Sequence, residues 1–438
     1  MKNNNISRRE FLKGLGVAGG TILAATSPWL KAFSEVEGTT GERLRVGIIG
    51  PGSRGRFLLG FVTQNPKVDV VAMADIYQPS IEEAKKIIPN ATPYHDYRQL
   101  LDDSRVQAVI IATPLSTHYQ IAHDAMAAGK DVYCEKTLCY SMDQCHSLYL
   151  QHLASGRILF TGQQRLFDPR YIRAMKLIHD GLIGKVTAIH AYWNRNGDWR
   201  RPVPDKRYEQ LINWRLYTRF SKGLMTELAC HQLQVGTWAL GKLPKRVMGT
   251  GAITFWNDGR EVYDNLNCIY QFETGEQMTY ASDIANKFYG LEEQILGSKG
   301  TMEPERGKYY MEDIAPAPAF LQLANSWEHS LFDEIPFAGT SWAPETANEN
   351  NGEYILGKRP KTDGTSIALD AWVEACITHR QPPRIIEEGY YASQLALWGY
   401  EAIKRGEALE FPSQYLIDYP AYGTKASATA ASEQNKKL

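Results

Sequence analysis

A glycine-rich turn near the start of the chain has the spacing of a phosphate-binding loop. Gly50-Pro51-Gly52-Ser53-Arg54-Gly55 fits the pattern G-x-G-x-x-G. An apolar run at 44–49 predicts a strand before the turn, and 56–64 predicts a helix after it. Glycines let the backbone approach a pyrophosphate closely, and the N-terminus of the helix favours its negative charge. In this context the turn predicts a dinucleotide site.

Asp75 indicates which dinucleotide is bound. It lies 20 residues after Gly55, at the end of a second apolar run at 68–74. A carboxylate at this position would accept hydrogen bonds from the adenosine ribose and repel a 2′-phosphate. We therefore expect NAD, held tightly, rather than NADP. Arg54 could instead reach a phosphate, which leaves NADP open.

A second candidate is the pair Glu135 and Lys136, which directly follows a short apolar run at 131–134. A Lys at the carboxyl end of a parallel strand points into the crevice where such sheets bind ligands. A Glu-Lys pair on its own is more often a solvated surface pair, so the spacing alone leaves both roles open.

The third candidate is one face of a predicted helix at 224–240. Glu227, His231, Gln234 and Trp238 are spaced i, i+4, i+7 and i+11, which places them on one side of a helix. A histidine here could exchange protons near neutral pH, or it could be a buried structural residue. By contrast, the C-x4-C-x5-C spacing of Cys134, Cys139 and Cys145 fits no zinc template, and we expect no metal site.

The elements that must position these residues form two predicted domains. Short apolar runs at 44–49, 68–74, 108–112, 131–134 and 158–161 alternate with helical segments, which predicts a parallel sheet covered on both faces. The fold class is therefore α/β, with an N-terminal Rossmann dinucleotide-binding domain at 43–163.

The pattern changes in the second domain, which we expect to span 164–420. Longer segments at 186–193, 246–256, 265–272 and 277–284 predict a mostly antiparallel open sheet within an α+β domain. Helices are predicted at 170–181, 224–240, 366–378 and 389–405. An irregular excursion at 313–362 and a disordered tail at 421–438 complete the chain.

The first 33 residues predict an export signal. Ser7-Arg8-Arg9-Glu10-Phe11-Leu12-Lys13 precedes an uncharged, Gly/Ala-rich stretch, as in a twin-arginine signal, and 34–42 is a linker. We expect the twin-arginine machinery to carry the folded protein to the periplasm. A vestigial signal would leave the protein in the cytoplasm.

Composition excludes some partners. The 438 residues carry 48 Lys plus Arg and 49 Asp plus Glu, so no positive field gathers nucleic acid. After the signal there is no apolar run long enough for a stable membrane anchor. Six cysteines in this length do not make a disulfide scaffold.

These motifs together resemble the Gfo/Idh/MocA family of nicotinamide-dependent oxidoreductases, which includes glucose-fructose oxidoreductase and inositol dehydrogenase. The matching residues cover most of 43–300 and are the turn at 50–55, Thr113-Pro114 with His118, Ala128-Gly129-Lys130, Glu135-Lys136, and 223–241. Segments 194–202 and 213–215 resemble the exported, Bacteroidota-type branch of the family.

The resemblance implies roles for several residues. Thr113, Pro114, His118 and Glu135 would border the cofactor with the turn, and Lys136 would polarise or deprotonate a substrate hydroxyl. Thr137 replaces the usual Pro, which we expect to loosen the backbone beside Lys136.

The same resemblance implies a substrate site on the second domain. His231 would be the general base, with a pKa suited to neutral pH, while Gln234 replaces a family Asp and cannot exchange protons. The residues expected at the sugar are Arg165, Trp214, Arg215, Glu227 and Gln234, with Trp193 and Trp199 as stacking surfaces.

The expected function is hydride transfer between NAD and a secondary hydroxyl of a carbohydrate or polyol. One alternative is a glycosidase that oxidises its substrate transiently with bound NAD, and another is a non-catalytic sugar or cofactor sensor. A small-molecule carbohydrate is the expected partner. We also expect a homo-oligomer, either a dimer or a tetramer, built through the C-terminal sheet.

Overall fold

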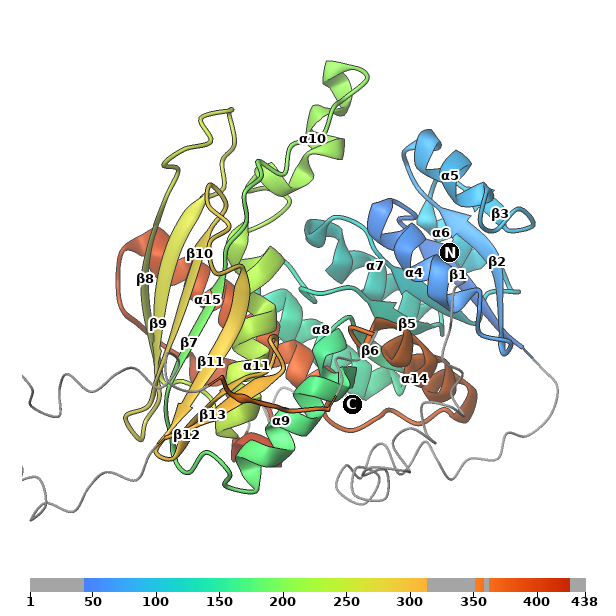
Figure 1. The fold of residues 1–438 in the computed structure, drawn as a ribbon. Coiled ribbons are helices and arrows are strands. Elements are labelled where there is room, and N and C mark those ends of the chain that lie inside the picture. The colour runs from blue at the N-terminus through green and yellow to red at the C-terminus, as the bar shows by residue number, and fades with distance from the viewer. Residues whose placement is uncertain (1–42, 313–350, 358–361, 426–438) are drawn as a thin grey trace, which may run out of the picture.

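The computed structural model describes residues 43–312, 351–357 and 362–425 (Figure 1). The predicted signal, the linker, most of the excursion at 313–362 and the chain after residue 425 lie outside these residues. Two sheets dominate the fold, each with its own helices, and they stand side by side (Figure 1). Within the described ranges, no helix is long and apolar enough to cross a membrane.

The first sheet has six parallel strands in the order β3-β2-β1-β4-β5-β6. This order, which reverses between β1 and β4, is that of a Rossmann domain and confirms the predicted fold class. The strands are β1 (Leu44–Ile49), β2 (Val68–Ala74), β3 (Thr92–Tyr94), β4 (Ala108–Ile111), β5 (Asp131–Cys134) and β6 (Leu159–Thr161).

Alternate residues of these strands enter different cores. Ile48 and Ile110 join one buried cluster, whereas Ile49 and Ile111 join the other. Both faces are apolar because helices cover both, which explains the continuous apolar runs in the sequence. The helices are α4 (Ser53–Val62), α5 (Gln78–Lys85), α6 (Tyr97–Asp102), α7 (Leu115–Ala127) and α8 (Met142–Ser155).

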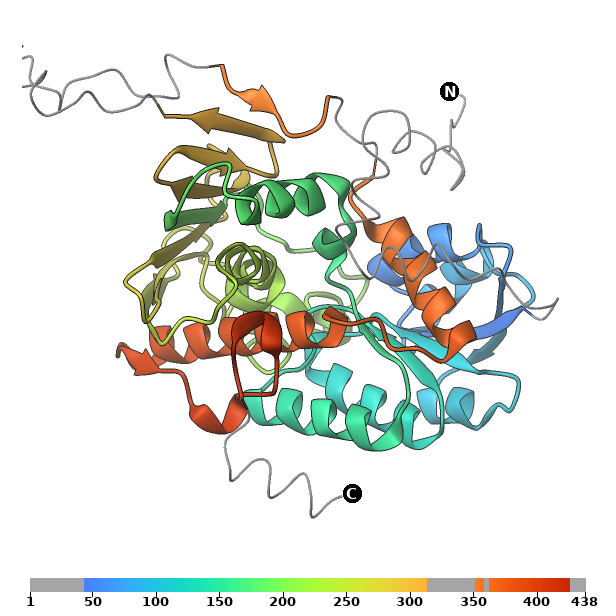
Figure 2. The same ribbon diagram turned by 90° about the horizontal axis from the view of Figure 1, so that it is seen from below.

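A helix from the far end of the chain also packs on the first domain. α14 (Thr365–Thr378) lies beside α4 (Figure 2), and its buried Trp372 meets Tyr133 of β5 at 5.8 Å between ring centroids. Polar contacts at the rim join the same segments: Lys67 Nζ donates to Glu374 Oε1 at 2.5 Å. Residues 365–378, predicted within the second domain, therefore cover the first.

The second sheet has nine strands in the order β14-β13-β12-β11-β7-β10-β9-β8-β15. Among the described strands of this sheet, only the central pair β7–β10 is parallel, which confirms a mostly antiparallel sheet. The strands are β7 (Val186–Trp193), β8 (Arg246–Ala252), β9 (Asn265–Gln271), β10 (Gln277–Asp283), β11 (Leu291–Gly297), β12 (Gly300–Glu303), β13 (Lys308–Met311), β14 (Glu353–Tyr354) and β15 (Leu409–Glu410).

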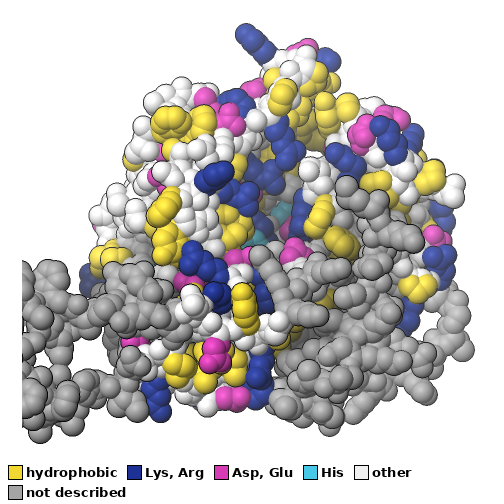
Figure 3. Space-filling model, in the orientation of Figure 1, with side chains coloured by type: hydrophobic (Ala, Val, Ile, Leu, Met, Phe, Trp, Pro, Cys, Tyr) yellow, Lys and Arg dark blue, Asp and Glu magenta, His cyan; other side chains and the backbone are white. Residues whose placement is uncertain are grey.

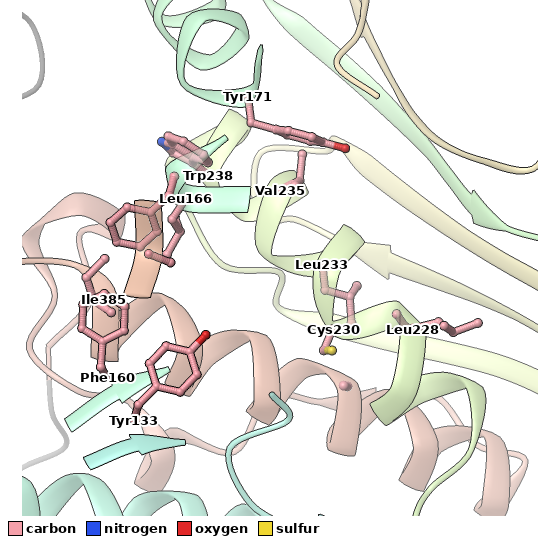
Figure 4. Close-up of a cluster of buried hydrophobic side chains, with 14 of the residues drawn as sticks. Tyr133, Phe160, Leu166, Tyr171, Leu228, Cys230, Leu233, Val235, Trp238 and Ile385 are labelled. Atoms are coloured by element: carbon pink, nitrogen blue, oxygen red, sulfur yellow. The ribbon is translucent and has the colours of Figure 1, made fainter. Parts of the chain in front are cut away.

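Three helices cover one face of this sheet: α9 (Pro169–His179), α11 (Cys230–Leu240) and α15 (Ile385–Arg405). α15 also packs on α8, so it bridges the two domains (Figure 2). Buried side chains of both domains therefore form one continuous cluster. In Figure 4 Tyr133 and Phe160 of the first sheet lie close to Ile385 of α15, and Cys230 and Leu233 of α11 belong to the same cluster.

The C-terminal segment is anchored further than predicted. We expected a disordered tail from residue 421, but Tyr422 is buried and its hydroxyl donates to Glu388 Oε2 at 2.7 Å. The burial of this ring and its hydrogen bond fix residues near 422 on the second domain, so residues 421–425 are not part of a disordered tail.

Candidate functional site

A deep cleft of about 1300 Å³ lies between the two domains. One wall holds the glycine turn and the two residues that follow β5, and the other holds the start of α11 and the turn before it. Lys and Arg side chains gather along this hollow (Figure 3). The cleft opens at the carboxyl ends of the parallel strands, where an open α/β sheet binds its ligands.

The glycine turn is shaped to receive a phosphate group. Gly50 has a φ of +83°, and a Cβ there would lie 2.7 Å from Thr113 Cγ2. A Cβ on Gly55 would collide with the carbonyl oxygen of Gly50, so this glycine is needed for helix–strand packing.

Gly52 differs, because a Cβ there would meet nothing within 4 Å and would project into open space. It caps α4, whose first turn holds no acidic residue and no side-chain cap. The free backbone N–H groups and the helix dipole thus face the cleft, and the turn fits a dinucleotide pyrophosphate.

Asp75 lines the same cleft, as predicted for a residue that contacts ribose. Its Oδ1 accepts the backbone N–H of Tyr77 at 2.9 Å, which fixes the carboxylate. Burial raises the pKa of Asp75. Arg54, the residue that left NADP open, has its Nε 2.8 Å from Glu135 Oε1 and is held in that ion pair.

Lys136 extends into the cleft from the end of β5. Its Nζ donates to the backbone carbonyl oxygen of Glu227 at 2.7 Å, so the predicted catalytic lysine bridges to the second domain. One bond to a carbonyl leaves further ammonium protons for a substrate oxygen.

Thr137 does not loosen the backbone beside Lys136, contrary to our expectation. The peptide bond between the two residues is cis. The buried Thr137 hydroxyl donates to the carbonyl oxygen of Thr226 at 2.6 Å, and the Thr137 carbonyl lies 2.9 Å from His118 Nδ1. The Thr137 hydroxyl and the Thr137 carbonyl oxygen thus both fix the backbone next to Lys136.

His118 clamps two loops together. Besides Thr137, it faces the carbonyl oxygen of Thr113, 2.9 Å from its Nε2. Burial lowers the pKa of His118. Each ring nitrogen faces a carbonyl oxygen, and the neutral imidazole donates to one of the two. His118 thus lies between the loops that follow β4 and β5, and Thr113 and Pro114 border the cleft beside it.

A wide helical turn, Met225–Ala229, precedes α11 and presents Glu227. The Glu227 carboxylate accepts Arg215 Nε and Ser221 Oγ, both at 2.9 Å. Burial alone would raise the pKa of Glu227, but Arg215 and Lys136 outweigh it, and the pKa lies below its ordinary value. Glu227 is therefore an anion that holds Arg215 in place.

His231 lines the cleft but is almost fully buried, with 4% of its surface exposed. Its Nδ1 has no hydrogen-bond partner among the described residues, and its ring lies 5.6 Å from that of Trp193. Burial and the charges of Lys136 and Arg165 hold the pKa of His231 well below its ordinary value. The expectation of a neutral-range pKa was wrong: the imidazole is uncharged and can accept a proton.

Two predicted substrate residues lie away from the cleft wall. Arg165 is buried and pairs with the buried Glu293, and its guanidinium lies 5.7 Å from the centroid of the Trp193 ring. Gln234 is fully buried, and its Nε2 donates to Glu388 Oε2 at 3.0 Å. Both side chains therefore make buried polar contacts with residues that are distant in the sequence.

Trp214 and Arg215 do reach the cleft, and the Arg215 guanidinium lies 4.2 Å from the centroid of the Trp214 ring. Trp193 and Trp199 line it as well. Our sequence analysis assigned no role to Arg195 and Arg201, which are also part of the lining. In the sequence, the only indication that Arg195 and Arg201 belong to the site was their position inside the segment 194–202.

Comparison with known proteins agrees with this geometry. The family described as "Oxidoreductase family, NAD-binding Rossmann fold" matches residues 44–163, and the "GFO/IDH/MocA C-terminal domain" matches residues 171–303. The chain belongs to the Gfo/Idh/MocA family of oxidoreductases. The NAD-binding description applies to the half that carries the glycine turn.

Individual members of the family are distant. Inositol 2-dehydrogenase of Rhizobium meliloti is 25% identical over 63% of this chain and 80% of its own length. A glycosyl hydrolase family 109 protein of Saccharopolyspora erythraea is 25% identical over 81% of this chain and 84% of its own. The crystal structure of GenD2 from gentamicin A biosynthesis, in complex with NAD, matches this chain with a TM-score of 0.65 at 20% identity. The match covers 86% of this chain and 98% of the GenD2 chain.

Proposed function

We propose that this family member transfers a hydride between NAD and a secondary hydroxyl of a carbohydrate or polyol. The observation that carries the proposal is the meeting of Lys136 and His231 in one cleft beside the glycine turn. NAD, when bound, supplies the hydride acceptor at its nicotinamide C4. The inositol dehydrogenases among the relatives support a polyol or sugar as the substrate.

The protein's own residues would manage the proton and the orientation of the substrate. Lys136, fixed on the Glu227 carbonyl, donates a hydrogen bond to the reacting oxygen and stabilises its developing negative charge. His231 is uncharged and accepts the hydroxyl proton. The ion pair of Arg215 with Glu227 holds the cleft wall beside both groups.

We propose NAD rather than NADP as the cofactor. Asp75 faces the cleft with its carboxylate fixed, and a 2′-phosphate beside it would be repelled. The charge of Arg54 is compensated by Glu135, with which its Nε forms an ion pair.

A second candidate is a glycosidase that uses bound NAD for transient oxidation and re-reduction of its substrate. The family 109 relative, which aligns with 81% of this chain, favours it. Lys136 and His231 would serve this reaction as well, because it also begins with removal of a hydroxyl proton.

One experiment separates the two reactions. The purified protein is incubated with NAD and a panel of free sugars, polyols and aryl glycosides, while nicotinamide absorbance and free sugar are followed together. Hydride transfer as the net reaction predicts reduced nicotinamide in proportion to oxidised product. Release of free sugar without net reduction identifies the glycosidase, and absence of both refutes both.

We also propose that residues 1–33 direct export through the twin-arginine machinery to the periplasm, and that NAD stays tightly bound there. The support is the Arg8-Arg9 motif. For the proposed homo-oligomer, the support is the large second sheet, where Tyr354 of β14 is 65% exposed and Phe288, between β10 and β11, is 76% exposed.

A further inference from the structure

Three arginines of the cleft wall form no ion pair among the described residues: Arg56, Arg195 and Arg201. Arg56 donates to the carbonyl oxygen of Pro51 at 3.0 Å, so Arg195 and Arg201 remain. The other arginines of the wall are paired, Arg54 with Glu135, Arg98 with Asp96, Arg200 with Asp258 and Arg215 with Glu227. Among the described residues, the guanidinium groups of Arg195 and Arg201 form no ion pair and no side-chain hydrogen bond.

Arg195 lies next to the proposed base. It follows β7, and its guanidinium stacks 5.1 Å from the centroid of the Trp193 ring, which is itself 5.6 Å from His231. The charge of Arg195 contributes to the lowered pKa of His231. Burial lowers the pKa of Arg195 too, and the only counteracting group is Tyr280.

Arg201 is held at the same wall by its backbone. Its N–H donates to Asn213 Oδ1 at 2.7 Å, and its carbonyl accepts Asn213 Nδ2 at 3.0 Å. Burial lowers the pKa of Arg201, and the charges of Arg215 and Arg56 lower it further. Cations placed together in this way lose stability unless an anion joins them.

We propose that the substrate is an anionic carbohydrate, whose carboxylate or sulfate group is bound by Arg195 beside His231, while Arg201 adds positive charge from the same cleft wall. This inference rests on the proposed function and names its substrate class. A guanidinium forms paired hydrogen bonds with planar and tetrahedral oxyanions, and the contact with the Trp193 ring holds the Arg195 guanidinium in place. A neutral polyol would leave both charges uncompensated.

The test compares matched sugars with the NAD-loaded protein: galacturonate with galactose, glucuronate with glucose, and glucose 6-sulfate as the ester. We expect kcat/KM at least about tenfold higher for one class of anionic sugar than for its neutral counterpart. Charge-assisted hydrogen bonds of this kind predict that Arg195→Gln and Arg201→Gln each lower that value about 10- to 100-fold. Added salt should raise KM for the anionic sugar.

The matched control is Arg207→Gln. Arg207 is 70% exposed, lies outside the cleft and pairs with Asp205, so its loss should leave both sugars unaffected. The type of anionic group is identified by which sugar, the uronate or the sulfate ester, has the higher kcat/KM relative to its neutral counterpart. Equal losses on neutral and anionic sugars overturn the proposal, and so does a stronger effect of Arg201→Gln on NAD binding than on sugar binding.

Failure of the proposed function is recognised separately by calorimetric binding. If no sugar is oxidised but galacturonate binds more tightly than galactose and Arg195→Gln abolishes the difference, the anion site stands and hydride transfer fails. If neutral sugars are oxidised without any anionic preference, hydride transfer stands and the anion site fails. Absence of preferential binding in both assays overturns the anion site.

Discussion

Substitution of alanine for each of two glycines in the same turn should affect different properties: NAD binding at Gly52 and stability of the fold at Gly55. At Gly52 an alanine Cβ has open space and the φ of −67° is accessible to alanine. Reduced freedom of the unfolded chain would stabilise Gly52→Ala by about 0.4–1 kcal/mol. Alanine is a poorer helix N-cap than glycine by a similar amount. We therefore expect an unchanged free energy of unfolding for the NAD-free protein.

Binding of NAD should nevertheless weaken in Gly52→Ala, since the methyl group occupies the space of the pyrophosphate. Loss of one backbone hydrogen bond to a charged group, worth about 1.5–3 kcal/mol, corresponds to roughly a 10- to 100-fold higher Kd. Gly55→Ala should instead destabilise the fold, because its Cβ would collide with the Gly50 carbonyl.

Chemical denaturation of NAD-free protein and calorimetric titration with NAD measure the two effects. Wild-type affinity in Gly52→Ala would refute the placement of the pyrophosphate over this turn. Wild-type stability in Gly55→Ala would refute the argument from helix–strand packing.

Three further predictions concern other parts of the account. Asp75→Ala should lose the preference for NAD over NADP, whereas Asp69→Ala, an exposed change on the same strand, should keep it; equal wild-type affinity for both cofactors would contradict the role of Asp75. Because the pKa of His231 is depressed, its limb in the pH dependence of kcat/KM should lie below the ordinary value of about 6.5, and His231→Ala should remove it. The unfolded chain binds this proton more readily, so the stability contribution of His231 should decline as pH falls below about 6.5; stability independent of this residue would argue against its burial. Arg8→Lys with Arg9→Lys should leave the protein folded and NAD-loaded but retained in the cytoplasm, and normal export of this variant in cell fractionation would count against the signal.

The sequence predicted those features that local patterns determine. The apolar runs at 44–49 and 108–112 identified the parallel strands, and the glycine spacing located the turn between β1 and α4. The position of Lys136 followed from the strand before it. In each case the residues that define the feature are neighbours in the chain.

The failures share a physical cause, which is contact with a distant segment. Arg165 is drawn to Glu293, which is 128 residues away, and Gln234 to Glu388, which is 154 residues away. The local pattern of apolar and polar residues does not reveal either partner. The pKa of His231 depends on burial and on charges from four other segments, those of Arg54, Lys136, Arg165 and Arg195, so helix spacing alone could not give it.

The turn before α11 illustrates a subtler limit. A regular helical period predicted Glu227 and His231 on one face, and both do line the cleft. The periodic pattern did not predict the wide turn at Met225–Ala229. This turn contains Glu227, whose backbone carbonyl accepts the hydrogen bond of Lys136.

The most direct test of the central claim is the turnover of Lys136→Ala on the substrate that the sugar screen identifies. Removal of a positioned proton-handling group should lower kcat about 10²- to 10⁴-fold. The NAD affinity should change far less, because the turn at 50–55 is untouched, and the exposed Lys185→Ala serves as the matched control. A Lys136→Ala protein with near wild-type kcat would contradict the proposed mechanism, even with the fold intact.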